Sequence, residues 1–230
     1  NMESRGPDSA GFAIYKKEEK KIFKYSLCIG DLDFNKFKKE ISKKIKKSKL
    51  NQYSDHVILK TSIEPKTVIK IINNSFPEIS LVGYGNSIEI FKQVGNPKDV
   101  VKKFKLDSFS GTHGIGHTRM ATESAITTDG SHPYSTGKDE CLVHNGSLSN
   151  HNNLRRELVK KGNIFNSEND TEVAAGYVSN SLLNKKSLKD TLVSGLKDLD
   201  GFYTFITGTK KGFAVVRDEI ACKPAVIAET

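Results

Sequence analysis

Gly116-His-Thr-Arg-Met-Ala-Thr122 is the stretch from which the rest of the chain is interpreted, because it is richer in polar side chains than a buried strand needs. Three stretches of the same kind follow it: Ser131-His-Pro-Tyr134, Val143-His-Asn-Gly-Ser147 and Glu168-Asn-Asp-Thr-Glu172. Strand-like apolar runs alternate with loops in this window, so several strand ends can converge on one small polar ligand. The sequence therefore predicts a binding site built from these four stretches.

The composition is that of an ordinary globular protein. The chain has 230 residues, of which 36% are hydrophobic and 27% charged, and this is enough to bury a core in one domain with an insert. No apolar run reaches the roughly 20 residues that a transmembrane helix needs, and the first residues show no signal peptide or transit segment. We therefore expect a cytoplasmic protein with no membrane partner.

Cysteine and histidine usage does not indicate a metal centre. The three cysteines, Cys28, Cys141 and Cys222, are odd in number and widely spaced, which favours reduced, buried thiols over disulfides or a zinc site. His113 and His117 are four residues apart, and strand periodicity places them on one face without a third ligand nearby. No metal is expected.

The basic charge of the chain is concentrated in one segment. The net charge is +9, and residues 16–49 contain thirteen lysines against five acidic residues. Within that segment Phe34, Phe37, Ile41 and Ile45 follow helical spacing, so the lysines are interpreted as the solvated face of an amphipathic helix. A phosphate-binding face is the alternative, but it would need aromatic or arginine residues among the lysines. We expect no nucleic-acid partner.

Periodicity and turn residues predict alternating strands and helices. Strands are predicted at 10–15, 21–29, 55–63, 79–84, 87–93, 114–118, 141–144, 202–207, 212–217 and 225–228. Helices are predicted after the capping residue Asp33 and at 65–74, 97–105, 150–161, 171–183 and 188–199. This pattern gives an α+β fold with antiparallel sheets. We interpret residues 16–110 as a lysine-rich α+β insert within one domain that covers 1–230.

The order of the motifs resembles the class II glutamine amidotransferase domain, which is of the N-terminal-nucleophile hydrolase type. The four polar stretches, together with Arg5-Gly-Pro-Asp-Ser-Ala-Gly11 and Asp200-Gly-Phe202, follow the family's order over nearly the whole chain. The phrases Gly111-Thr-His-Gly-Ile-Gly-His117 and Cys141-Leu-Val-His-Asn-Gly-Ser-Leu-Ser-Asn150, with the insert, resemble glutamate-synthase-related subunits, including the amidotransferase-like subunit of N-methylglutamate synthase. The resemblance implies a four-layer αββα sandwich with the insert on one edge.

The resemblance also implies a reaction. In this family a terminal cysteine thiolate attacks the side-chain amide of glutamine, its α-amino group moves the proton, and ammonia leaves a glutamyl thioester. An α-amine with a pKa near 8 can act as a base near neutrality. Asn145, through its side-chain amide, and Gly146, through its backbone N–H, would bind the oxyanion. Without the resemblance, an Asn-Gly pair is more commonly a hairpin turn.

Four further residues are assigned to substrate binding by the resemblance. Arg119 would hold the α-carboxylate of the ligand with two parallel hydrogen bonds, helped by Thr122, and Asp170 would accept from the α-ammonium. His132 would line the substrate loop, and a structural hydrogen bond is an equally good interpretation of this residue. Taken alone, an arginine and an aspartate are more often a surface salt bridge.

The chain departs from the family pattern at both ends. Asn1 lies only four residues before Arg5, whereas the family places its cysteine a few dozen residues further upstream, and Thr230 precedes the family's closing strands. Cys28, Cys141 and Cys222 are internal and lack a free α-amine. We therefore expect these 230 residues to be truncated at both ends and to bind ligand without turning it over.

Two functions remain open. One is an enzyme subunit that, when intact, hydrolyses glutamine or handles glutamate and delivers nitrogen to partner synthase subunits in a hetero-oligomeric complex. FMN and iron–sulfur centres are then expected on those partners, with no cofactor in this chain. The alternative is a non-catalytic amino-acid-binding or assembly module that retains the pocket. The nitrogen acceptor is not indicated by the sequence.

Overall fold

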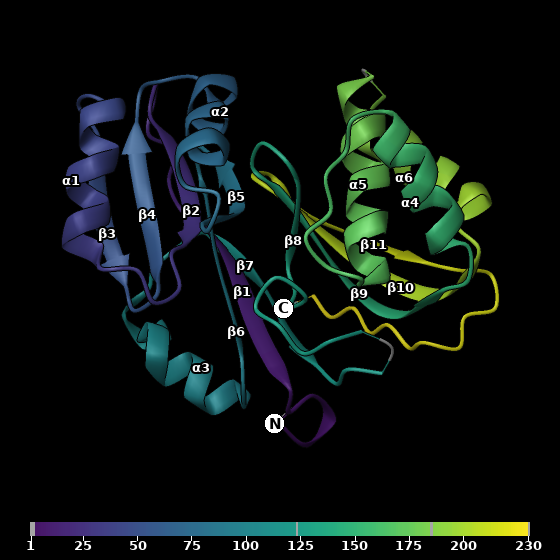
Figure 1. The fold of residues 1–230 in the computed structure, drawn as a ribbon. Helices are drawn as coiled ribbons and strands as arrows, with labels where there is room; N and C mark the ends of the chain where they lie inside the picture. The colour runs from purple at the N-terminus through teal and green to yellow at the C-terminus, as the bar shows by residue number, and fades with distance from the viewer. Residues whose placement is uncertain (1–2, 123, 185, 230) are drawn as a thin grey trace.

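The computed structural model describes residues 3–122, 124–184 and 186–229 and contains three antiparallel sheets (Figure 1). The first sheet has the order β6-β1-β7, with β1 at Ser9–Tyr15, β6 at Ile88–Val94 and β7 at His113–Arg119. β1 is the central strand, and its partners run antiparallel on both sides. The polar stretch that starts at Gly116 thus begins inside β7 and continues past its end.

The second sheet and its helices hold the other polar stretches. Its order is β11-β10-β9-β8, with β8 at Tyr134–Gly137, β9 at Glu140–Leu148, β10 at Gly201–Thr209 and β11 at Gly212–Arg217. The helices α4 at His151–Lys160, α5 at Asp170–Leu183 and α6 at Leu188–Asp198 cover one face (Figure 1). Leu142 and Phe205 of this sheet and Val178 of α5 belong to one apolar cluster.

The two sheets pack face to face and are flanked by helices. Ala13 and Ile115 of the first sheet share an apolar cluster with Cys141 and Val143 of β9. On the other face of the first sheet, α3 at Pro97–Phe104 packs against β1 and β6 through three aromatic rings, those of Phe12, Phe91 and Phe104. The layers are therefore α3, first sheet, second sheet and α4–α6, which is the αββα order that the resemblance implies.

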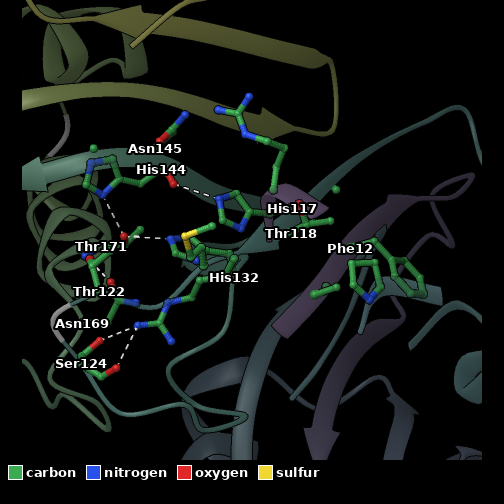
Figure 2. Close-up of a pocket in the computed structure, with 18 of the residues that line it drawn as sticks. Phe12, His117, Thr118, Thr122, Ser124, His132, His144, Asn145, Asn169 and Thr171 are labelled. Carbon is green, nitrogen blue, oxygen red and sulfur yellow. Dashed lines mark hydrogen bonds between the residues drawn. The ribbon is translucent and has the colours of Figure 1, made fainter. Parts of the chain in front are cut away.

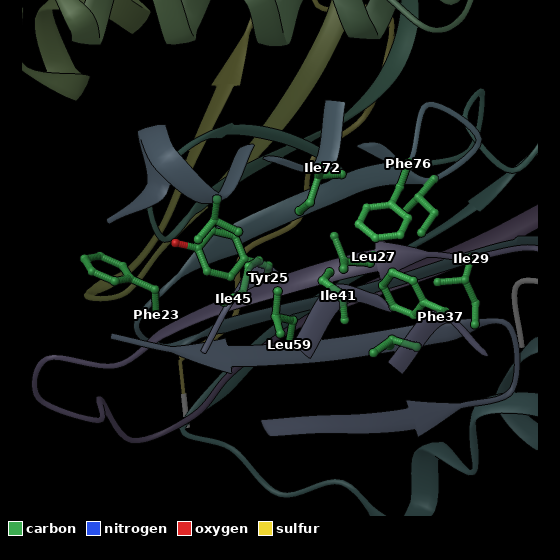
Figure 3. Close-up of a cluster of buried hydrophobic side chains, with 13 residues drawn as sticks. Phe23, Tyr25, Leu27, Ile29, Phe37, Ile41, Ile45, Leu59, Ile72 and Phe76 are labelled. Carbon is green, nitrogen blue, oxygen red and sulfur yellow. The ribbon is translucent and has the colours of Figure 1, made fainter. Parts of the chain in front are cut away.

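A third sheet forms a separate lobe. It has the order β3-β4-β2-β5, with β2 at Phe23–Cys28, β3 at Lys49–Tyr53, β4 at His56–Thr61 and β5 at Ser80–Gly85, and carries α1 at Phe34–Lys44 and α2 at Pro65–Ser75. Figure 3 shows their shared core, in which Phe37, Ile41 and Ile45 are buried. The lysines of α1 are exposed, as the amphipathic interpretation predicts. Asp33 caps α1 by accepting from the N–H of Lys36.

The region 16–110 is divided between the lobe and the sandwich. Residues 23–85 build the third sheet and its helices, whereas β6 pairs with β1 and α3 covers the first sheet. Two short 3-10 turns, Glu3–Arg5 and Leu106–Ser108, complete the described elements. No helix in the described ranges is long and apolar enough to cross a membrane.

One predicted strand is wrong and two observed strands were not predicted. Residues 225–228 are not a strand, and Val226 and Ile227 are 93% and 74% exposed. Apolar composition alone cannot form a strand, because the backbone needs a partner for its hydrogen bonds. β3 and β8 were missed because the first is polar and the second has four residues.

Candidate functional site

The six residues assigned from the resemblance line one cavity of about 730 Å³. Arg119 ends β7, Thr122 follows in the next loop, His132 precedes β8, and Asp170 begins α5. Asn145 and Gly146 lie on β9. Figure 2 labels three of the six, Thr122, His132 and Asn145, around the same space. Asn169, the N-cap of α5, lies beside them.

Asn145 and Gly146 are in the middle of a strand pair and not in a turn. They pair with Thr204 and Tyr203 of β10, which rules out the hairpin-turn interpretation. Gly146 has a φ of 146°, and a Cβ there would lie 2.0 Å from the carbonyl oxygen of Phe202. Only glycine fits this position. Asn145 is exposed, so its amide is free to meet a ligand at the cavity wall.

Arg119 is a buried cation held by the loop that follows it. Its guanidinium donates to the hydroxyl of Ser124 at 2.6 Å and to the carbonyl oxygens of Ser124 and Ala125 at 3.4 Å. Within the described ranges it forms no ion pair, and the side chain is 7% exposed. The surface salt bridge considered for Arg119 and Asp170 is therefore absent. A buried guanidinium that meets only neutral oxygens retains its attraction for an anion.

Asp170 is held as an anion at the N-terminus of α5. Its Oδ2 accepts from the backbone N–H of Leu148 at 2.9 Å, and its Oδ1 lies 3.6 Å from Nδ1 of His144. Burial by itself would raise the pKa of Asp170, but the hydrogen bonds and charge of His144 and the Leu148 N–H lower it overall. The helix N-terminus also favours a negative charge here. The carboxylate can therefore accept from an ammonium group.

Three histidines form a cluster beside these residues, and only His132 was assigned to the ligand site from the sequence. His132 Nε2 and His144 Nδ1 lie 2.8 and 2.9 Å from the hydroxyl of Thr171. His117 donates from Nε2 to the carbonyl oxygen of His144, and its ring lies 4.1 Å from that of His132 (Figure 2). Burial lowers the pKa of His117 to about 4 and that of His132 well below its usual value. Both rings are neutral near pH 7.

The missed residues had a sequence signal. His117, His144 and Thr171 each belong to one of the four polar stretches and lie next to, or two positions from, an assigned residue. Their contact with one another is tertiary, since they come from β7, β9 and α5. His132 reaches this cluster because Gly11 of β1 allows close approach; a Cβ at Gly11 would lie 2.2 Å from the carbonyl oxygen of His132.

Asn169 connects α5 with the loop that leads to His132. As the N-cap of α5, its side-chain oxygen accepts from the N–H of Thr171 at 2.8 Å. Its amide nitrogen donates to the carbonyl oxygen of Gly130 at 3.0 Å. One side chain thus caps the helix that carries Asp170 and fastens the adjoining loop.

Lys92 of β6 fastens the same loop from the other side. Its ammonium donates to the carbonyl oxygens of Asp129 and Ser131 at 3.0 and 2.9 Å and lies 4.4 Å from the ring centre of Tyr134. Burial lowers the pKa of Lys92 to about 8. Ser80 of the lobe also donates to the side chain of Asp129, so the third sheet contacts the site loop.

The side chains considered as metal ligands have other partners. His113 stacks on Tyr15 with ring centres 4.4 Å apart and bonds the carbonyl oxygen of Thr209, away from the cluster of His117. Elsewhere in the described ranges, Cys28, Asp55 and His56 place ligand atoms within 4.8 Å of one another. There the ammonium of Lys103 already lies 2.8 Å from Asp55, so a cation balances that carboxylate.

Comparison with known proteins identifies the family. A family model described as a glutamine amidotransferase domain matches residues 117–230. The glutamine amidotransferase-like protein GlxB of Rhizobium meliloti is 49% identical over 232 residues, covering 100% of this chain and 77% of that protein. A putative glutamine amidotransferase of Methanothermobacter thermautotrophicus is 33% identical, covering 99% of this chain and 79% of that protein.

Solved structures agree on the fold. The glutamine phosphoribosylpyrophosphate amidotransferase of B. subtilis superposes with a TM-score of 0.57 at 20% identity, and the match covers 94% of this chain and 32% of that one. This confirms the predicted α+β, αββα architecture. The two sequence matches, which span 99% to 100% of this chain, show its family: this chain belongs to the class II glutamine amidotransferase family.

Proposed function

We propose that this chain is the glutamine-binding and glutamine-hydrolysing part of a nitrogen-transferring enzyme. The observation that carries the proposal is that Arg119, Asp170 and the Asn145–Gly146 pair share the wall of one cavity. A cation, an anion and two neutral N–H donors match the carboxylate, ammonium and carbonyl oxygen of glutamine or glutamate.

In the proposed complex the ligand's α-carboxylate binds Arg119. In this structure the guanidinium donates to Ser124 and Ala125. When the ligand's carboxylate replaces some of these acceptors, it forms two charge-assisted hydrogen bonds with the guanidinium. Thr122 adds a hydroxyl at the same wall. The α-ammonium donates to Asp170, and the side-chain amide then points toward Asn145 and Gly146.

The proposed chemistry is thioester formation followed by hydrolysis. A cysteine sulfur bonds to the amide carbon, and the carbonyl oxygen carries the negative charge that Asn145 and Gly146 stabilise. The α-amine of that cysteine takes the thiol proton as the sulfur attacks, and it passes this proton to the amide nitrogen as the carbon–nitrogen bond breaks and ammonia leaves. Water then cleaves the thioester, which yields glutamate and restores the thiol.

We place this cysteine at a processed terminus upstream of residue 1, as the family resemblance implies. Among the described residues that line the cavity there is no cysteine. Cys141 is fully buried beneath Tyr15, and burial raises the pKa of its thiol to about 11. Burial also raises the pKa of Cys28. An elevated pKa suppresses the thiolate, so we propose that residues 1–230 alone bind ligand and do not hydrolyse it.

We further propose that the ammonia is delivered to partner synthase subunits of the glutamate synthase or N-methylglutamate synthase type, in a cytoplasmic hetero-oligomer. The motif phrases that begin at Gly111 and Cys141 support this choice of partner. FMN and iron–sulfur centres would belong to those partners. The nitrogen acceptor would bind there as well.

Three measurements test the proposal. Calorimetry should show that the chain binds L-glutamine or L-glutamate, and that Asp170→Asn weakens binding. Asp198→Asn, at the C-terminal end of α6 and outside the cavity lining, should not. Mass spectrometry of the native subunit should find a mature N-terminal cysteine, and a glutaminase assay with and without co-purifying partners should show ammonia release. Binding without such a terminus and without ammonia release would favour the non-catalytic module.

A further inference from the structure

The hydroxyl of Thr171 joins three groups of the site. Its Oγ1 lies 2.8 Å from Nε2 of His132, 2.9 Å from Nδ1 of His144 and 3.3 Å from Oδ1 of Asp170. These partners come from the approach to β8, from β9 and from the first residue of α5. Thr171 is 1% exposed, so solvent cannot replace any of these contacts.

The donor count of a hydroxyl fixes the direction of these hydrogen bonds. A threonine hydroxyl has one proton and two lone pairs. The carboxylate of Asp170 only accepts, so the Thr171 proton points to it and both imidazole nitrogens donate to Thr171. His132 is then protonated on Nε2 and His144 on Nδ1. This agrees with the remaining nitrogens, His132 Nδ1 and His144 Nε2, which are buried without partners among the described residues.

The arrangement links the two halves of the ligand site. His144 directly precedes Asn145 on β9, and its carbonyl oxygen accepts from His117. Asp170 is tied to the same strand at its other end by the N–H of Leu148. Thr171 is therefore a second point, besides the Leu148 N–H, at which the carboxylate on α5 is fixed relative to the amide-bearing strand β9.

We infer that Thr171 is a positioning residue that orients the Asp170 carboxylate toward the α-ammonium of the ligand. This rests on the proposed function, because it takes the ligand to be an α-amino acid. Removing the hydroxyl would leave Oδ1 of Asp170 with only the longer 3.6 Å contact to Nδ1 of His144, and it would leave the Nε2–H of His132 without its partner. The variant should therefore lose affinity for ligands that carry an α-ammonium and keep its affinity for ligands that lack one.

The test compares L-glutamate with glutarate, which has both carboxylates and no α-ammonium. By calorimetry on the whole chain we expect Thr171→Val to weaken L-glutamate binding about tenfold, as for loss of a hydrogen bond to a charged group, and to leave glutarate binding within about twofold. Thr171→Ser keeps the hydroxyl and should restore most of the preference for L-glutamate. Thr191→Val is the matched control, because Thr191 is a buried helical threonine whose hydroxyl has no partner among the described residues.

The outcomes separate the inference from the function on which it rests. If the unmodified chain binds neither L-glutamine nor L-glutamate, the proposed function and this inference both fail. If it binds L-glutamate but Thr171→Val retains the L-glutamate preference, or loses both ligands equally, the inference alone is overturned. Should Thr171→Val not fold, Thr171→Ala is measured in the same way. Nitrogen NMR of the unmodified chain adds an independent check, since protonation of His132 on Nδ1 would also overturn the arrangement.

Discussion

Arg119 carries a positive charge that has no ion-pair partner among the described side chains. It is buried and donates to neutral oxygens of Ser124 and Ala125. A lysine at this position keeps the charge but loses the planar fork. We predict that Arg119→Lys weakens L-glutamate binding about tenfold, measured by calorimetry. Arg156→Lys, on the exposed surface of α4, is the control, and equal affinity in both variants would contradict the role of Arg119.

Gly146 carries two separate constraints, a left-handed φ and a crowded neighbourhood. We predict that Gly146→Ala destabilises the chain by more than about 1 kcal/mol, because the φ of 146° is strained for alanine and the Cβ meets the Phe202 carbonyl. Gly212→Ala isolates the first effect, since Gly212 has a φ of 142° with nothing within 4 Å. Urea unfolding measures the free energy of unfolding of both variants. Equal losses in Gly146→Ala and Gly212→Ala would show that the contact with the Phe202 carbonyl does not destabilise the chain.

At the scale of elements, the N-terminus of α5 brings helix, strand and loop together. Asn169 caps α5 and also bonds Gly130 of the site loop, whereas Ser187 caps α6 and bonds Asp190 of the same helix. We predict that Asn169→Ala and Ser187→Ala each lower the free energy of unfolding by about 1 kcal/mol or more, but that only Asn169→Ala weakens ligand binding. Urea unfolding and calorimetry on both variants test this. An unchanged affinity in Asn169→Ala would show that the loop is held without it.

At the scale of the whole molecule, buried neutral histidines make stability depend on pH. The pKa of His117 falls to about 4 and that of His132 well below its usual value, mainly through burial, whereas unfolded histidine has a pKa near 6.5. As pH drops below about 6.5, the unfolded state takes up protons that the folded state does not, so the free energy of unfolding falls. Above that pH these histidines do not make the free energy of unfolding depend on pH.

We predict that the urea midpoint of the chain falls between pH 7 and pH 5, before most carboxylates titrate. His117→Gln removes one of the titrating groups and should flatten this dependence. Asn152→Gln, on the exposed surface of α4, removes no titrating group and should leave the slope unchanged. A slope that His117→Gln does not alter would mean that other groups control acid sensitivity.

The elements with strong local signals were predictable. Helices that begin at Pro65 and Pro97 and the apolar spacing of Phe37 and Ile41 were expected, since capping and periodicity act within a few residues. The polar strand β3 gave no such signal. The apolar run at 225–228 wrongly predicted a strand, because strand formation depends on a neighbouring strand that the local sequence does not specify.

The sequence by itself determined the residue types of the site and their order, from Arg119 through His132 and Asn145 to Asp170, because charge, amide and imidazole chemistry are properties of single side chains. Only the tertiary structure decided that Asn145 and Gly146 lie within a strand, that His117 and His144 support them, and that Thr171 joins two histidines to Asp170. Those contacts span tens of residues along the chain, and the packing of two sheets and one helix end creates them.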